Sequence, residues 1–127
     1  MPFGEQLKHY RRAKRIEQTE LAEQLQVSRD SIMVLENREI KFPNLELLNN
    51  IIDILGIRDK IVLPDYINFL MDNPSKKIKA FKEKKKLSHN EFARLLDLDR
   101  SNLRKWINGQ VQISVKGYEK LKKVGVV

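Results

Sequence analysis

Basic side chains that can attract a polyanion are concentrated in the second half of this 127-residue chain. Residues 74–127 hold 15 Lys and Arg against 5 Asp and Glu, a net charge of +10, whereas residues 1–57 and residues 58–73 each carry −1. The long-range attraction for a polyanion therefore belongs almost entirely to residues 74–127. Closely spaced hydrogen-bond donors in this part form two groups: Lys82, Lys84, Lys85 and Lys86, and then Arg100, Ser101, Asn102, Arg104 and Lys105.

The sequence gives little support to catalysis or metal binding. The acidic residues are scattered, and the chain has no Ser/His/Asp set, no Gly-rich phosphate loop and no His-Glu-x-x-His spacing. There is no cysteine, and His9 and His89 are isolated, so neither a thiolate site nor a histidine-based metal site is indicated. We therefore expect a protein that is not an enzyme and that needs no cofactor or metal.

Membrane insertion and export are not indicated either. No apolar run approaches the roughly 20 residues that span a bilayer. The start of the chain, residues 1–5, lacks the basic region and apolar stretch of a signal peptide. The absence of cysteine suits a reducing compartment. We expect a cytoplasmic protein.

The elements that must position the basic groups occur twice in the chain. Residues 16–37 and residues 87–108 superpose without a gap at an offset of 71, and every core position is apolar in both. The identical pairs are Glu20/Glu91, Ala22/Ala93, Leu25/Leu96, Arg29/Arg100 and Asn37/Asn108. Such a repeat indicates two copies of one structural unit.

Apolar residues at helical spacing predict an all-α bundle around each copy. In the first, helices are expected around Leu7 and Tyr10, around Leu21 and Leu25, after the N-cap Ser28, and from Pro43-Asn44 to Gly56. In the second, the corresponding signals are Ile78 and Phe81, a capping box of Ser88 and Glu91, the N-cap Asp99, and Ser114. Between them, a connector contains a short amphipathic helix with Tyr66, Ile67, Phe69 and Leu70.

The first copy closely resembles the phage repressor and Cro-like (XRE) helix-turn-helix family. The resemblance lies in Gln18-x-Glu20-Leu21-Ala22, Val27-Ser28-Arg29-x-Ser31-Ile32-x-x-Leu35-Glu36-Asn37, Pro43 and Leu55-Gly56-Ile57, and it covers most of residues 3–57. Residues 75–126 resemble the family more loosely, through Glu91-Phe92-Ala93, Leu103, Trp106, Asn108-Gly109 and Val124-Gly125-Val126. The chain departs from the family at the turn before the third helix, where Gln26 and Asp97 replace the usual glycine, and at Arg38, where Asn-Gly is usual.

The resemblance implies two tandem lambda-repressor-like helix-turn-helix bundles joined by a short helical connector. We place the first bundle at residues 1–57, the connector at 58–73 and the second, strongly basic bundle at 74–127. In this family the third helix lies in the DNA major groove, and dimers bind paired half-sites.

By position, the resemblance implies which residues of the second bundle contact DNA. Arg100, Ser101, Arg104 and Lys105 would face the bases, with Asn102 nearby; Arg and Lys donate to guanine O6 and N7, and Ser and Asn are adaptable. His89 would contact a phosphate. The flanking phosphates would be neutralised by Lys82, Lys84, Lys85, Lys86 and Arg94.

The matching positions of the first bundle are Arg29, Asp30, Met33 and Val34. DNA repels an aspartate unless its carboxylate accepts a hydrogen bond from a cytosine amine. Met33 and Val34 fit either a thymine methyl group or a protein-contact patch. Gln18, Arg29 and the basic first helix still permit DNA binding by this bundle.

The sequence thus predicts a sequence-specific DNA-binding transcriptional regulator, a repressor of phage or mobile-element type that binds a double-stranded operator. The alternative is an adaptor or antitoxin-like protein whose first bundle binds a protein partner while the second binds DNA. RNA binding is weakly supported, because the second half offers few aromatic residues for stacking. Tyr66, Phe69 and Leu70 are most simply packing residues, with a homodimer interface as the alternative.

Overall fold

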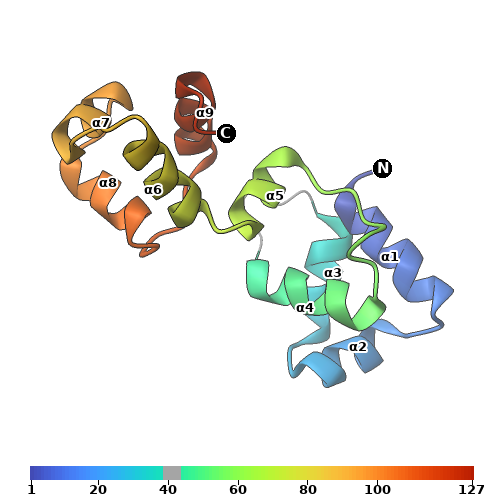
Figure 1. The fold of residues 1–127 in the computed structure, drawn as a ribbon. Helices are drawn as coiled ribbons and strands as arrows, with labels where there is room; N and C mark the ends of the chain where they lie inside the picture. Colours follow the sequence, from blue (N-terminus) through green and yellow to red (C-terminus); the bar gives the residue numbers. More distant parts are fainter. Residues whose placement is uncertain (39–43) are drawn as a thin grey trace. The chain divides into compact units, whose positions relative to one another are not determined.

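The computed structural model describes residues 1–38 and 44–127, and these residues form nine helices and no strand. They divide into two compact units, Met1–Pro64 and Asp65–Val127 (Figure 1). The predicted all-α class is confirmed. The part of the fourth helix signal that falls on Pro43 lies outside the described residues.

The first unit contains α1 (Phe3–Ala13), α2 (Gln18–Leu25), α3 (Arg29–Asn37) and α4 (Leu45–Leu55). The predicted N-cap of α3 is present, since Ser28 Oγ accepts a hydrogen bond from the Ser31 amide at 3.2 Å. Asn44 Oδ1 accepts from the Leu47 amide at 3.1 Å and begins α4. The apolar stripes of the four helices meet in one core that contains Leu7, Leu21, Ile32, Leu35, Leu48, Ile51, Ile52 and Leu55.

The second unit contains α5 (Asp65–Met71), α6 (Pro74–Lys84), α7 (His89–Leu95), α8 (Arg100–Ile107) and α9 (Val115–Val124). The predicted capping box of α7 is formed, because Ser88 and Glu91 each accept a hydrogen bond from the other's amide at 3.1 Å. Asp99 Oδ1 accepts from the Ser101 amide at 2.8 Å at the start of α8. The core of this unit contains Ile78, Phe92, Leu96, Leu103, Ile113 and Leu121.

The two copies keep the same turns as well as the same helices. In the turns that lead into α2 and α7, Arg15 and Lys86 both adopt left-handed backbone, with φ of 58° and 53°. Gln26 and Asp97, which replace the family's glycine, do the same with φ of 57° and 53°. The copies differ after the third helix, where Gly109 is left-handed with φ of 68° and the matching Arg38 is extended with φ of −114°. Left-handed backbone is less favourable for a residue with a Cβ atom than for glycine.

Replacing Gln26 by glycine should therefore stabilise the first unit. We expect the free energy of unfolding to rise by about 0.5–1 kcal/mol, because left-handed backbone is unfavourable for a residue with a Cβ atom. Asp97→Gly should give a smaller gain, since aspartate tolerates this conformation better. Chemical denaturation measures both changes.

The control is Gln24→Gly, which places glycine inside α2 and should lower the stability by about 0.5–1 kcal/mol. A loss of stability in Gln26→Gly would contradict the argument from backbone strain.

Helix α5 packs within the second unit. Phe69 and Leu70 are 4% and 7% exposed, and the Phe69 ring lies 5.0 Å from the Tyr118 ring of α9. The Tyr66 hydroxyl donates a hydrogen bond to the Ile113 carbonyl, and partial burial raises the pKa of Tyr66. Phe69 and Leu70 thus pack inside the second unit, and the homodimer interface at Tyr66, Phe69 and Leu70 stays a prediction.

The predicted connector is divided between the units and is not a separate segment. Residues 58–64 belong to the first unit, where the Val62 amide donates to Gln6 Oε1 and Gln6 Nε2 donates to the Val62 carbonyl, both at 2.8 Å. Residues 65–73 belong to the second unit. The contacts within the chain thus give one boundary, between Pro64 and Asp65, where the sequence predicted two, at 57/58 and 73/74. The reason is that both halves of the connector make specific tertiary contacts that the local pattern did not reveal.

Candidate nucleic-acid interface

Helix α8 presents all of its predicted base-reading side chains to solvent. Arg100, Ser101, Asn102, Arg104 and Lys105 are exposed, while Leu103 and Trp106 are 0% and 8% exposed on the opposite face. The 3.6-residue period of the helix explains the division, since residues 101, 104 and 105 share one face. The exposed face therefore carries three cationic donors and two side chains, Ser101 and Asn102, that can both donate and accept. The buried face packs α8 against the rest of the unit.

Helix α9 holds α8 from behind through a close contact at Gly117. A Cβ atom at this position would lie 2.7 Å from Trp106 Cζ2 and 2.9 Å from Ile113 Cγ2. Glycine is therefore required for α9 to approach the indole ring this closely. The contact makes the orientation of α8 a property of the packed unit and not of α8 alone.

The start of α8 is bound to the start of α7. His89 Nε2 lies 2.9 Å from the Arg100 carbonyl oxygen, and because this oxygen can only accept, the ring nitrogen donates. Arg100 Nη1 donates to Asn90 Oδ1 at 2.9 Å. Sequence reasoning did not single out Asn90, whose only signal was a polar side chain in the first turn of α7. The phosphate contact of half-buried His89 stays a prediction.

The predicted phosphate-binding residues of the second unit are spread over two helices and a turn. Lys82 is half-buried on α6, whereas Lys85, Lys86 and Arg94 are exposed. Lys85 also lines a groove formed with α9. The unit as a whole holds 15 basic and 7 acidic side chains, a net charge of +8, while residues 1–64 hold 10 of each.

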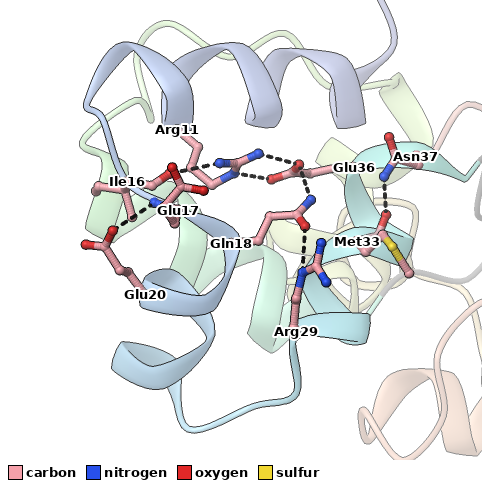
Figure 2. Close-up of polar contacts among 9 residues, drawn as sticks. All are labelled: Arg11, Ile16, Glu17, Gln18, Glu20, Arg29, Met33, Glu36 and Asn37. Carbon is pink, nitrogen blue, oxygen red and sulfur yellow. Dashed lines mark hydrogen bonds and ion pairs between the residues drawn. The ribbon is translucent and has the colours of Figure 1, made fainter.

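The corresponding face of the first unit differs in kind. Arg29 and Asp30 are exposed on α3, Met33 is 37% exposed and Val34 is half-buried. Arg29 Nε donates to Gln18 Oε1 at 3.2 Å, so a side-chain contact holds this arginine against the start of α2 (Figure 2). The face thus combines one partly engaged cation with an anion and an exposed thioether.

Gln18 connects this surface to a buried ion pair. Its Nε2 donates to Glu36 Oε1 at 3.0 Å, and Glu36 in turn accepts from Arg11 through Nε at 2.7 Å and Nη2 at 3.0 Å (Figure 2). Arg11 Nη1 donates to the Ile16 carbonyl at 2.8 Å. The side chains of Arg11 and Glu36 are 6% and 2% exposed. The hydrogen bond to Glu36 raises the pKa of Arg11, against the opposing effect of burial.

The second unit has no equivalent of this pair. At the offset of 71, Lys82 takes the place of Arg11 and Ile107 the place of Glu36. Nothing in the sequence distinguished Arg11, which is buried, from the other basic residues of the first helix. Glu36 lies 25 residues away and on another helix, so no spacing within one helix predicted the ion pair.

Two family profiles match the chain. One described as a helix-turn-helix domain matches residues 2–60, and one described as helix-turn-helix matches residues 78–121. The chain is a tandem helix-turn-helix protein of the lambda-repressor-like family. No curated protein and no solved structure matches it at a significant level. The resemblance found in the sequence is confirmed for both copies, and it supports a DNA-binding regulator.

The family match also bears on enzymatic activity, and the described residues bear on metal binding and membrane insertion. Families of this kind are typically non-enzymatic. In the two described ranges, no group of three or more His, Cys, Asp and Glu side chains could hold a metal ion. No helix that the structure describes is long and apolar enough to cross a membrane.

The first domain nevertheless has a cationic groove at the start of α2. This groove has a volume of about 560 Å³. Its polar lining includes Gln18, Thr19 and Arg29, and its cations from α1 and the following turn are Lys8, Arg11, Arg12 and Arg15. Five of the ten basic residues in 1–64 line this groove together with the carboxylate of Glu17, and Arg11 among the five is paired with Glu36. The groove gives the first domain a place where an anion such as a phosphate would be attracted.

Proposed function

We propose that this tandem helix-turn-helix protein is a sequence-specific transcriptional repressor of the phage or mobile-element type, and that α8 of the second domain reads the operator. The observation that carries the proposal is the exposed face of α8. Five polar or basic side chains lie on it with no acidic residue between Arg100 and Ile107, in a unit of net charge +8. Repression would follow from occlusion, because a protein seated in the major groove excludes other proteins from that stretch of DNA.

The proposed readout assigns bases and phosphates to different parts of the second domain. Arg104 and Lys105 lie one turn beyond Arg100 and Ser101, so the four side chains can reach successive base pairs from one helix face. Arginine reads guanine through two parallel hydrogen bonds, and Asn90 restrains Arg100 before DNA binds. Phosphate contacts would come from Lys82, Lys85, Lys86, Arg94 and His89.

The first domain would contribute mainly through its cationic groove. Gln18 and Arg29 lie in this groove beside the α1 cations, and phosphate contact there positions a protein without reading sequence. On α3, the carboxylate of Asp30 would be repelled by the phosphates of DNA. We infer a weaker and less sequence-dependent DNA contact from this domain than from the second.

Selection from a random double-stranded DNA library, followed by footprinting with the full chain, tests this proposal. We expect one enriched motif that contains guanine, and a protected stretch centred on it. The binding constant should fall steeply with salt, and Lys86→Ala should reduce the salt slope by about 1 if this lysine contacts a phosphate. Binding without an enriched motif would contradict sequence-specific repression.

The exposed Met33 favours a second candidate, in which α3 of the first domain binds a protein partner. Met33, Asp30 and Val34 form a small mixed patch, and methionine suits adaptable protein contacts. Under this candidate the protein would be an adaptor or antitoxin-like, with only its second domain on DNA. An Asp30→Ala/Met33→Ala variant should then keep the motif and the footprint unchanged. A shortened footprint would show instead that α3 contacts DNA.

A further inference from the structure

The second unit carries an apolar groove that the proposed DNA contacts leave almost unused. It has a volume of about 790 Å³ and lies between the second half of α6, the end of α7 and α9. Phe81, Leu87 and Leu95 contribute to its apolar lining, Lys85, Lys120 and Lys123 contribute its cations, and Asp97 contributes one acidic side chain, so the cations remain in excess. Lys85 is the one residue that it shares with the phosphate contacts proposed above.

Leu95 is the clearest sign that something covers this groove. Its side chain is 51% exposed, the largest exposure of any Leu, Ile or Phe among residues 1–38 and 44–127. The duplicated scaffold supplies a reference, because the matching residue of the first unit is Gln24, which is polar and exposed. The same position at the end of the second helix is thus polar in one copy and apolar in the other. Folding of the scaffold therefore does not require a leucine here.

The three lysines define the chemistry of the occupant. Lys120 Nζ donates to the Asp97 carbonyl at 2.9 Å, which places this ammonium group beside the α7–α8 turn. None of the three forms an ion pair with a described residue. A partner that buries Leu95 must also approach these cations, and carboxylates would compensate them.

We propose that this groove binds an acidic amphipathic helix of a partner protein. Apolar side chains one turn apart would lie against Leu95, Phe81 and Leu87, and flanking Asp or Glu would face Lys85, Lys120 and Lys123. A second copy of this chain fits poorly, because a two-fold interface would bring the same lysines together. DNA fits poorly as well, since the apolar lining offers nothing to phosphates.

A fluorescent synthetic peptide of about four helical turns, with leucine at core spacing and glutamate on both flanks, serves as the probe. Anisotropy with the full chain measures its affinity. Leu95→Gln, which installs the residue of the first unit, should weaken binding at least about tenfold. Lys123→Glu should weaken it by about as much, whereas Lys116→Glu should change it less than about twofold. Lys116 is exposed on the same helix and lies outside the groove. Because both variants replace a lysine by a glutamate, they change the net charge equally.

Three results would overturn the proposal. Equal binding of a scrambled peptide of the same composition, or equal loss in Lys123→Glu and Lys116→Glu, would mean that charge alone explains the affinity. Concentration-dependent self-association in sedimentation that Leu95→Gln abolishes would assign the groove to a second copy. Because Leu95 is half-exposed and Lys123 is exposed, both variants should keep the fold, and circular dichroism checks this. DNA binding is measured for Leu95→Gln against the unchanged chain, and for Lys123→Glu against Lys116→Glu, so that each comparison is made at equal net charge and separates this proposal from the repressor proposal.

Discussion

Replacing both Arg100 and Arg104 by alanine should abolish sequence-specific DNA binding by the full chain. Both side chains are exposed on α8, and each bidentate contact with a guanine contributes about 1–3 kcal/mol of discrimination. If the two losses add, the affinity for the selected motif should fall by about 2–6 kcal/mol, while non-specific binding should weaken much less. A titration of the motif and of an unrelated duplex at one salt concentration measures both quantities.

Arg29→Ala is the matched control, because Arg29 occupies the place of Arg100 in the first domain and is also held by a residue of the preceding helix. Its loss should be smaller and nearly independent of sequence. Equal losses for Arg29→Ala and Arg100→Ala would mean that both domains read bases. Unchanged sequence specificity in the Arg100→Ala/Arg104→Ala variant would show that these two arginines of α8 do not read the bases. The two alanine substitutions on α8 should leave the stability of the fold unchanged, because neither arginine is buried.

Replacing Glu36 by alanine should have the largest effect on stability that a single polar side chain in the described ranges can produce. The change removes three hydrogen bonds and leaves Arg11 as a buried cation without its carboxylate. Breaking a buried ion pair on one side typically costs about 3–5 kcal/mol, because the remaining charge stays desolvated. Hydrogen exchange should show lost protection in α1–α4 and unchanged protection in α6–α9, and denaturation measures the magnitude.

Exposed Glu23 on α2 provides the control, and Glu23→Ala should change stability by less than about 0.5 kcal/mol. The double variant Arg11→Met/Glu36→Leu should recover much of the loss, because apolar replacement of both partners removes the unpaired charge. The second domain already keeps its fold with Ile107 in the place of Glu36. A double variant as unstable as Glu36→Ala would show that the hydrogen bonds, and not the unpaired charge, hold the unit.

The ion pair also bears on function, since the same carboxylate holds Gln18 and Gln18 holds Arg29. Loss of Glu36 would therefore release a side chain on the surface of α3 as well as loosen the core. The second domain restrains Arg100 differently, through Asn90 and the His89 contact with its carbonyl, both at the surface. In one domain the core thus takes part in placing the first residue of the third helix. In the other domain, neighbouring surface side chains place it.

Local pattern alone determined the repeat, the helices, the caps at Ser28, Ser88 and Asp99, and the charge difference between the two halves. It also determined which face of α8 is exposed, because helical period and capping act over four residues or fewer. The left-handed backbone at Gln26 and Asp97 lies where the resemblance to the family, and not the local pattern, implies a glycine.

Only the tertiary structure decided where side chains meet partners distant in the sequence. Arg11 proved buried because Glu36 reaches it from α3, and α5 joined the second unit because Phe69 meets Tyr118. The exposed Leu95 and its neighbouring lysines became a groove only when α6, α7 and α9 were packed together. Burial of a charge or exposure of a leucine depends on what the rest of the chain brings to that place. Sequence spacing within one helix carries no information about that.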